Sequence, residues 1–214
     1  MKKLKKEKIR ISKSQLIEIG SFLIIVLCSG MLFFQIYSNN KKNEENNNMI
    51  EEYFEQEQVE EKVEENIDDP VIEKQNIEVN LEKYIGVLEI GKINVKRGFY
   101  PKTSRNNNVN RNLEVLNESD MPDKENGNVI IAAHSGNSYI SFFRNLNKLS
   151  FGDTAKIYYE GKIYNYSLMN SYEINKNGTA HIVRNAYKNT LTLITCKHNT
   201  NKQIVYIFEL NNIE

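Results

Sequence analysis

The chain has two cysteines, and they lie in very different surroundings. Cys28 is inside an apolar run, where a small apolar side chain is its ordinary role. Cys196 ends the strand-like run TLTLITC and is followed by the polar stretch KHNTN. Nearby Lys197 and Lys202 favour the thiolate, which is the nucleophilic form of cysteine. The pattern predicts a nucleophile at Cys196, while a core cysteine that packs as a small apolar residue stays open on position alone.

A nucleophilic cysteine needs a base or cationic partner that is close in space but not necessarily in sequence. Three histidines are available. His134 ends the run NVIIAA and precedes SGN, a strand-to-loop exit of the kind where functional side chains often lie. His181 and His198 are in loop-like stretches, where a surface histidine is the default interpretation. We therefore expect His134 to be the proton-transfer partner of Cys196.

The sequence predicts neither a cofactor nor a metal site. The histidines and Cys196 never fall at the spacing of metal ligands, and no Gly-rich phosphate motif or Walker-type lysine occurs. Residues 81–214 carry 17 Lys and Arg against 12 Asp and Glu. This mild basic excess lacks clustered arginines and aromatics, which argues against nucleic acid as a partner.

Near the N-terminus the sequence predicts a membrane anchor. Residues 19–36 contain no charge, and 18 residues of helix span roughly 27 Å, close to the hydrocarbon thickness of a bilayer. Residues 1–15 carry seven Lys and Arg, so the positive-inside rule places this tail in the cytoplasm and the chain after the anchor (residues 16–37) outside. A cleaved signal peptide is the alternative, but the apolar core is too long and no small-x-small cleavage pattern follows it.

The chain after the anchor divides into a polar part and a patterned part. Residues 38–80 are acidic, rich in Asn and poor in apolar residues, and they are expected to form a flexible spacer. A polar helix over 49–67 is possible there, but charge repulsion favours an extended chain. From residue 81 onward short apolar runs alternate with Gly, Asn and Lys, so 81–214 is expected to fold as one domain without the spacer.

Alternating apolar residues in this last part predict many short strands and few helices, which is typical of a β-barrel or sandwich. In the last strand, Ile204, Tyr206 and Phe208 should share one face and Val205 and Ile207 the other. The predicted strands are 85–90, 93–99, 128–133, 154–159, 162–173, 190–196 and 203–210. One helix is predicted from the three- and four-residue steps between Tyr139, Phe142, Phe143, Leu146 and Leu149.

Several of these segments together resemble the sortase family. The resemblance covers essentially all of 81–214, and its most specific feature is a strand-end histidine segment paired with LTLITC. An N-terminal anchor with a polar spacer is also the usual layout of that family. The matching segments are YIGVLEIGKINVKRGFYP (84–101), GNVIIAAHSG (127–136), FFRNLNKLSFGD (142–153) and TLTLITC (190–196).

The resemblance implies a closed β-barrel with one or two short helices and a cysteine transpeptidase that cuts a sorting motif of the LPxTG kind. Cys196 would form a thioester with the threonine of the motif, and His134 would transfer protons. An amine of a cell-wall precursor or of a pilin would then accept the surface protein. The implied location is the cell membrane, with a single pass and the barrel on the outer surface of a Gram-positive-type cell.

One departure from the family concerns the strand after the cysteine, where sortases carry an arginine. That strand reads NKQIVYIFEL here and contains none. Gln203 is the best match to the position, with Lys202 one residue away and pointing to the other face if both are on the strand. Arg144 or Arg184 could reach the site from another element.

Two other functions are compatible with parts of the pattern. Exported Cys/His transpeptidases that cross-link peptidoglycan carry both residues in one short Ser-His-Gly-Cys run, whereas His134 and Cys196 lie far apart here. A sortase-shaped barrel that binds a surface protein without catalysis is the main alternative, because the arginine is missing and a fold alone does not establish function.

Overall fold

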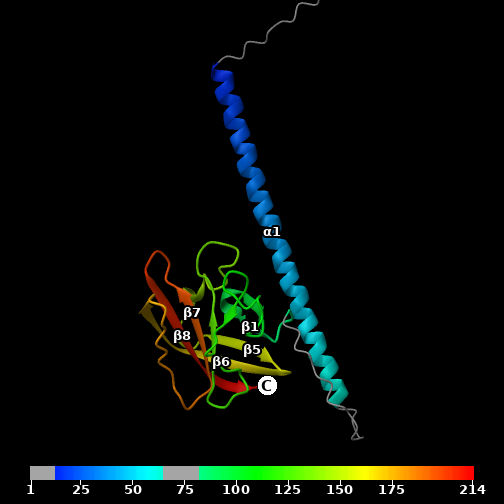
Figure 1. Cartoon of the computed structure of the whole chain (residues 1–214), viewed down its shortest axis with the longest axis vertical. Coiled ribbons are helices and arrows are strands. Elements are labelled where there is room, and N and C mark those ends of the chain that lie inside the picture. Colours follow the sequence, from blue (N-terminus) through cyan, green and yellow to red (C-terminus); the bar gives the residue numbers. More distant parts are fainter. Residues whose placement is uncertain (1–12, 65–81) are drawn as a thin grey trace, which may run out of the picture. The chain divides into compact units, whose positions relative to one another are not determined.

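The computed structural model of the chain describes residues 13–64 and 82–214 (Figure 1). The chain divides into two compact units, Met1–Glu44 and Glu45–Glu214. Residues 1–12 of the predicted basic tail and residues 65–80 of the predicted spacer lie outside the described residues. The two units are taken in turn.

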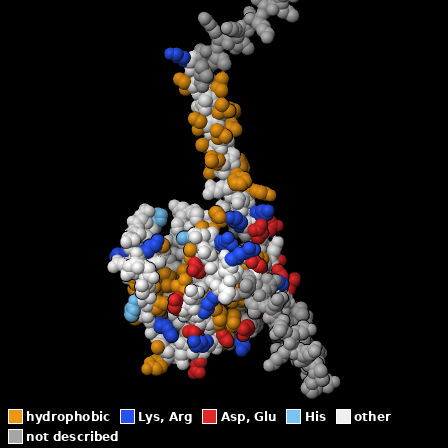
Figure 2. All heavy atoms as spheres, in the orientation of Figure 1, with side chains coloured by type: hydrophobic (Ala, Val, Ile, Leu, Met, Phe, Trp, Pro, Cys, Tyr) orange, Lys and Arg blue, Asp and Glu red, His pale blue; other side chains and the backbone are white. Residues whose placement is uncertain are grey.

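The N-terminal described element is the helix α1, Lys13–Glu64. Its stretch Ile17–Gln58 is the one described helix that is long and apolar enough to cross a membrane, judged by length and composition. Large apolar side chains between Ile17 and Tyr37 are exposed all around it, and Figure 2 shows them as an orange column. Hydrophobic surface on every side of a helix is unfavourable in water and is typical of a helix surrounded by lipid.

The helix α1 continues through residues 38–64. The prediction of an extended spacer is therefore wrong for this stretch. Within the second unit, α1 contributes Ile50 and Tyr53 to an apolar cluster with Tyr84, Val87 and Tyr100. Three- and four-residue steps place Met49, Ile50, Tyr53 and Phe54 on one face of the helix. This apolar stripe is a surface on which the helix packs. The prediction of an extended spacer rested on the number of acidic residues and did not take the stripe into account.

Two acidic side chains of this helix segment, Glu52 and Glu57, have partners within the second unit. Glu52 forms an ion pair with Lys83 at 2.6 Å. Glu57 accepts hydrogen bonds from the Tyr53 hydroxyl and, at 2.7 Å, from the backbone N–H of Gly161. The segment therefore belongs to the folded unit.

Eight strands form one sheet in the order β2-β1-β5-β6-β8-β7-β4-β3, which curls into a nearly closed barrel. Among the described strands β4 and β7 are the parallel pair, and all other neighbours are antiparallel. The mainly β fold expected from the sequence is confirmed, and β3 is the strand that it did not predict. The strands are β1 Gly86–Ile90, β2 Val95–Phe99, β3 Glu114–Val115, β4 Asn128–Ala132, β5 Thr154–Tyr159, β6 Lys162–Asn175, β7 Thr190–Cys196 and β8 Lys202–Ile213.

Strand alternation separates the barrel interior from an outer apolar shelf. On β8, Tyr206 and Phe208 belong to the main core, as the alternation predicted. Val205 and Ile207 face outward and pack with Ile130 of β4, Ile194 of β7 and residues of the β6–β7 connection. Both faces of β8 are therefore buried, which explains its continuous apolar run.

Among the described strands, β2 and β3 are the two edges of the sheet and are not paired with each other; side chains of the segment between them connect them instead. Asn112 is buried and its Nδ2 donates to the carbonyl of Gly98 at 2.8 Å. Its Oδ1 accepts from Nε of Arg97 at 3.1 Å. Burial lowers the pKa of the Arg97 guanidinium, although nearby Tyr84 and Tyr100 act in the opposite direction.

The α-helix predicted between Tyr139 and Leu149 is wrong. The segment forms successive tight turns and one short 3-10 helix, η2, Leu146–Lys148. A second short 3-10 helix is η1, Gly91–Ile93. The backbone N–H of Phe143 donates to the carbonyl of His134 at 3.0 Å, so it is not available for a bond along a helix. Three-residue turns repeat apolar positions nearly as α-helices do, which explains the incorrect prediction.

Candidate active site

The two residues expected to do chemistry end adjacent parallel strands. The β4–β7 register pairs Asn128 with Thr190 and Ala132 with Ile194. One further ladder bond runs from the backbone N–H of Ala133 to the carbonyl of Ile194 at 3.2 Å. The same offset carried past the end of β4 brings His134 level with Cys196. The sheet therefore joins residues that are far apart in the sequence.

Hydrogen bonds between the two strand ends hold this arrangement. The Thr195 hydroxyl donates to the carbonyl of Ala133 at 2.7 Å, and the Ser135 hydroxyl donates to the carbonyl of Cys196. Among the described residues, no hydrogen bond joins the Cys196 thiol to an imidazole. Catalytic hydrogen bonds often tighten only when substrate is bound, so this geometry is compatible with proton transfer between the two groups.

His134 and Cys196 line the same open cavity, whose volume is about 470 Å³. Both side chains are half-buried, so the thiol and the imidazole can be reached from solvent. His198 also lines this cavity, which sequence reasoning did not anticipate. The full lining is His134, Ser135, Gly136, Cys196, Lys197, His198, Asn199, Thr200 and Asn201.

Gln203 and Lys202 occupy different positions relative to this cavity. Gln203 is paired directly with Cys196 across the β7–β8 hairpin, so the two side chains share a face of the sheet. Gln203 is half-buried and is not itself one of the lining residues. Lys202 is exposed, and its Nζ lies 3.0 Å from a carboxylate oxygen of Glu173.

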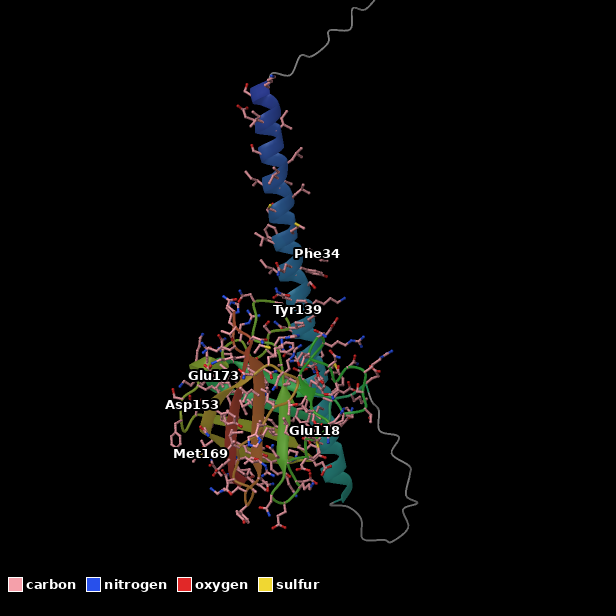
Figure 3. The ribbon with its side chains drawn as sticks, turned by 60° about the vertical axis from the view of Figure 1, so that its left-hand side comes forward. Phe34, Glu118, Tyr139, Asp153, Met169 and Glu173 are labelled. Carbon is pink, nitrogen blue, oxygen red and sulfur yellow. The ribbon has the colours of Figure 1, made fainter. Side chains whose placement is uncertain are left out.

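The two lysines that were expected to favour the Cys196 thiolate are both paired with one acid. Glu173 of β6, labelled in Figure 3, accepts from Lys197 through one oxygen and from Lys202 through the other. These hydrogen bonds hold the pKa of the Glu173 carboxyl below its usual value. The expectation of free cationic charge beside the thiol is therefore corrected, because the carboxylate partly cancels it. The three side chains instead fix the turn that lines the cavity.

Neither arginine considered as a substitute for the missing family residue lines the cavity. The Arg144 guanidinium donates to the carbonyls of Ser141 and Ser138. The Arg184 guanidinium donates to the carbonyls of Asn185 and Lys188. Each arginine is thus bonded to its own loop.

Asn110 is a site residue that the sequence analysis missed. Its Oδ1 lies 3.1 Å from Nε2 of His134. The only signal in the sequence was the Asn-rich run NNNVNRN (106–112), since asparagine is common in turns for reasons unrelated to catalysis.

A buried apolar cluster packs on the outer face of the sheet, next to the strand ends that carry the site. Ile194 and Val205 are the buried neighbours, two residues away, of Cys196 and Gln203 on that face. Ala180 and Ile182 from the β6–β7 connection pack against the same cluster. These apolar side chains are buried or partly buried, so the cluster supports the strand ends that carry Cys196 and Gln203 and is not itself an open surface.

A family model of the sortase domain matches residues 88–209, which is more than half of the chain and includes both strand ends of the site. The chain belongs to the sortase family. Membership confirms the resemblance to sortases, and the roles of individual residues in this sortase are predictions.

Solved structures of sortases share the fold. Sortase A from Corynebacterium diphtheriae matches with a TM-score of 0.54 at 20% identity, over 61% of this chain and 62% of that one. A Clostridium perfringens sortase D5 transpeptidase matches with a TM-score of 0.57 at 23% identity, over 78% of this chain and 98% of that one. Streptococcus pneumoniae sortase C matches with a TM-score of 0.55 at 20% identity, over 63% of this chain and 69% of that one. No curated protein matches the sequence.

Proposed function

We propose that this sortase is a membrane-anchored transpeptidase that cleaves an LPxTG-like sorting motif and transfers the surface protein to an amine. The observation that carries the proposal is the β4–β7 register, which brings the two strand ends bearing His134 and Cys196 to one solvent-accessible cavity. Family membership supports the same chemistry.

In the proposed reaction the Cys196 thiolate attacks the carbonyl carbon of the threonine in the motif. A C–S bond forms, the peptide C–N bond breaks, and the His134 imidazolium gives its proton to the departing amine. The incoming amine then attacks the thioester. Its C–N bond forms, the C–S bond breaks, and His134 takes up the proton, so that the enzyme returns to its initial state.

The acyl oxygen needs a hydrogen-bond donor while negative charge develops on it. We assign this contact to the amide of Gln203, because Gln203 is paired with Cys196 on the same face. Lys202, the other residue considered for the contact, is bonded to Glu173 and acts through the shape of the turn. A neutral amide gives a weaker bond than the arginine of other sortases.

The proposed location is the cell membrane, with α1 as a single-pass anchor, the N-terminus in the cytoplasm and the barrel outside. This assignment is supported by the apolar helix and by the basic residues before it. Sorting-signal proteins and an amine of the cell wall or of a pilin are the proposed partners. No nucleic acid and no cofactor enters the proposed reaction.

Intact-mass spectrometry on the full chain in detergent tests the proposal. The protein is incubated with a panel of LPxTG-like peptides, with and without an amine acceptor. An acyl adduct on Cys196, which the acceptor converts to a transfer product, is the expected result. Cys28→Ala is the matched control and should keep the adduct, whereas Cys196→Ala should lose both adduct and product. Peptide binding without any adduct would support the non-catalytic barrel instead.

A further inference from the structure

Of the three histidines, His134 is the one whose ring has a hydrogen-bond partner among the described residues. The partner atom, Oδ1 of Asn110, is an amide oxygen, which can only accept. With this oxygen facing the ring, we assign Nε2 of His134 as the donor, and in the neutral ring the lone pair is then on Nδ1. The contact selects one tautomer of the imidazole.

We propose that Asn110 is a positioning residue that holds the His134 ring in the Nε2–H tautomer, so that Nδ1 exchanges the proton with the substrate. The inference rests on the proposed function, because it names the nitrogen that performs the proton transfer. Asn110 would act through His134 and would not itself touch the reacting atoms.

The backbone around His134 is already fixed, which leaves the ring orientation as the variable that Asn110 controls. The carbonyl of His134 accepts from the N–H of Phe143 at 3.0 Å. On the next residue, Ser135 donates to the carbonyl of Cys196. These bonds restrain the main chain but leave the rotation of the imidazole free. A single acceptor on Nε2 removes that freedom and fixes which nitrogen faces away from Asn110.

Asn110 is exposed, yet its loop is held on both sides by asparagine side chains. Asn107 makes two bonds to the backbone of Val115 in β3, accepting at 2.7 Å and donating at 2.9 Å. Asn112 donates to the carbonyl of Gly98 in β2. The Asn-rich run is thus a brace between the two edge strands of the barrel, and Asn110 lies between its two anchors.

A local turn fixes Asn110 itself. Oδ1 of Asn108 accepts from the backbone N–H of Asn110 at 2.8 Å, which is the geometry of an Asx turn. The backbone N–H of Asn112 donates to the carbonyl of Asn108 at 2.9 Å. The amide of Asn110 therefore projects toward His134 from a fixed main chain, as a preorganised positioning group requires.

The test uses full-length protein labelled with ¹⁵N-histidine, in detergent or nanodiscs, and compares wild type with Asn110→Ala and Asn110→Asp. Only three histidines contribute signals, and His134→Gln identifies the relevant one. Wild type should show the Nε2–H tautomer, and Asn110→Ala should show a mixture with Nδ1–H. Asn106→Ala, a change in the same loop whose side chain bonds Glu82, is the matched control and should leave the tautomer unchanged.

Kinetics on a sorting peptide give the second readout. Asn110→Ala should lower kcat/KM roughly two- to tenfold, as expected for the loss of one neutral hydrogen bond. Asn110→Asp keeps the acceptor and adds a charge that stabilises the imidazolium, so the pH–rate profile should move to higher pH. Activity loss in Asn110→Ala with an unchanged tautomer and pH profile would overturn the proposal, as would an Nδ1–H tautomer in wild type. If wild type formed no thioester at all, the proposed function would fail, while the tautomer comparison would still decide the role of Asn110.

Discussion

At the scale of single residues, Gln203 is the side chain that we propose in place of the arginine of other sortases. Gln203 pairs with Cys196 across the hairpin, and Lys202 points to the opposite face, toward Glu173. The two residues can therefore be separated by mutation. Their different environments predict different effects on catalysis.

Gln203→Ala should lower kcat/KM for peptide transfer, since the loss of an oxyanion donor costs up to about 2.7–4 kcal/mol and a neutral donor falls at or below this range. Gln203→Arg should keep or raise the rate, because it restores a charge-assisted donor. Steady-state assays on both variants check this. A silent Gln203→Ala beside a crippling Lys202→Ala would show that the contact is made from the other face of β8.

His134→Ala should lose at least about a hundredfold in turnover, the lower limit of general acid–base help. His198 lines the same cavity but its ring has no hydrogen-bond partner among the described residues, so His198→Ala should stay within a few-fold of wild type. Both are measured as transfer rates at saturating amine. Equal losses in the two variants would require a new assignment of the proton-transfer residue.

Tyr166 offers a separate test of stability. The side chain is fully buried in the barrel core, and its hydroxyl has no hydrogen-bond partner among the described residues. Burial raises the pKa of the phenol, so it remains neutral. An unsatisfied buried group costs about 1–3 kcal/mol, so Tyr166→Phe should leave the free energy of unfolding unchanged or raise it. A clear loss of stability in denaturant titrations of Tyr166→Phe would show that the hydroxyl has a partner.

At the scale of elements, the turn Lys197–Asn201 between β7 and β8 is fixed by Glu173 of the neighbouring strand. Glu173→Gln should loosen the turn and lower kcat/KM a few-fold, because the amide holds the two lysines less strongly. High salt should have a similar effect on wild type and a smaller one on the variant, since salt screens exposed ion pairs. Glu118→Gln, which changes an exposed acid far from Glu173 in the sequence, is the control. Equal salt responses in wild type and Glu173→Gln would contradict this role.

The packing of α1 changes what we expect of a truncated protein. A fragment that begins near residue 82 would expose Tyr84, Val87 and Tyr100, which Ile50 and Tyr53 cover in the folded unit. A fragment 45–214 should therefore be more stable in urea than 82–214, by several kcal/mol, because each large buried side chain contributes about 1.5–3 kcal/mol. Glu51→Ala, an exposed change on the same helix, should have no such effect. Equal stability of the two fragments would restore the interpretation of 38–80 as a mere spacer.

At the scale of the whole molecule, the sequence was informative where one physical signal dominated. Alternation predicted every long strand, since a strand with one face in the core must repeat every two residues. It failed at β3, which has only two residues, Glu114 and Val115. Over 38–64 the density of acidic residues outweighed the stripe containing Ile50 and Tyr53, although the stripe determines the structure.

The candidate site was predictable only in part. The positions of Cys196 and His134 at strand ends were visible in the sequence, but their alignment depends on the β4–β7 register, a long-range pairing. Asn110 could not have been selected, because its neighbours Asn107 and Asn108 look identical in the sequence. Only the three-dimensional course of the loop distinguishes the asparagine that reaches His134.

The parallel pairing of β4 with β7 also affects when activity arises during folding. Cys196 meets Gln203 through a hairpin, which closes a short loop and can form early. His134 comes level with the thiol only after a loop of about sixty residues has closed, an entropic cost that grows with loop length. We expect the barrel to acquire transfer activity in its last slow phase of refolding, later than the hairpin. A newly synthesised chain would then carry a thiol without its partner until the barrel is complete.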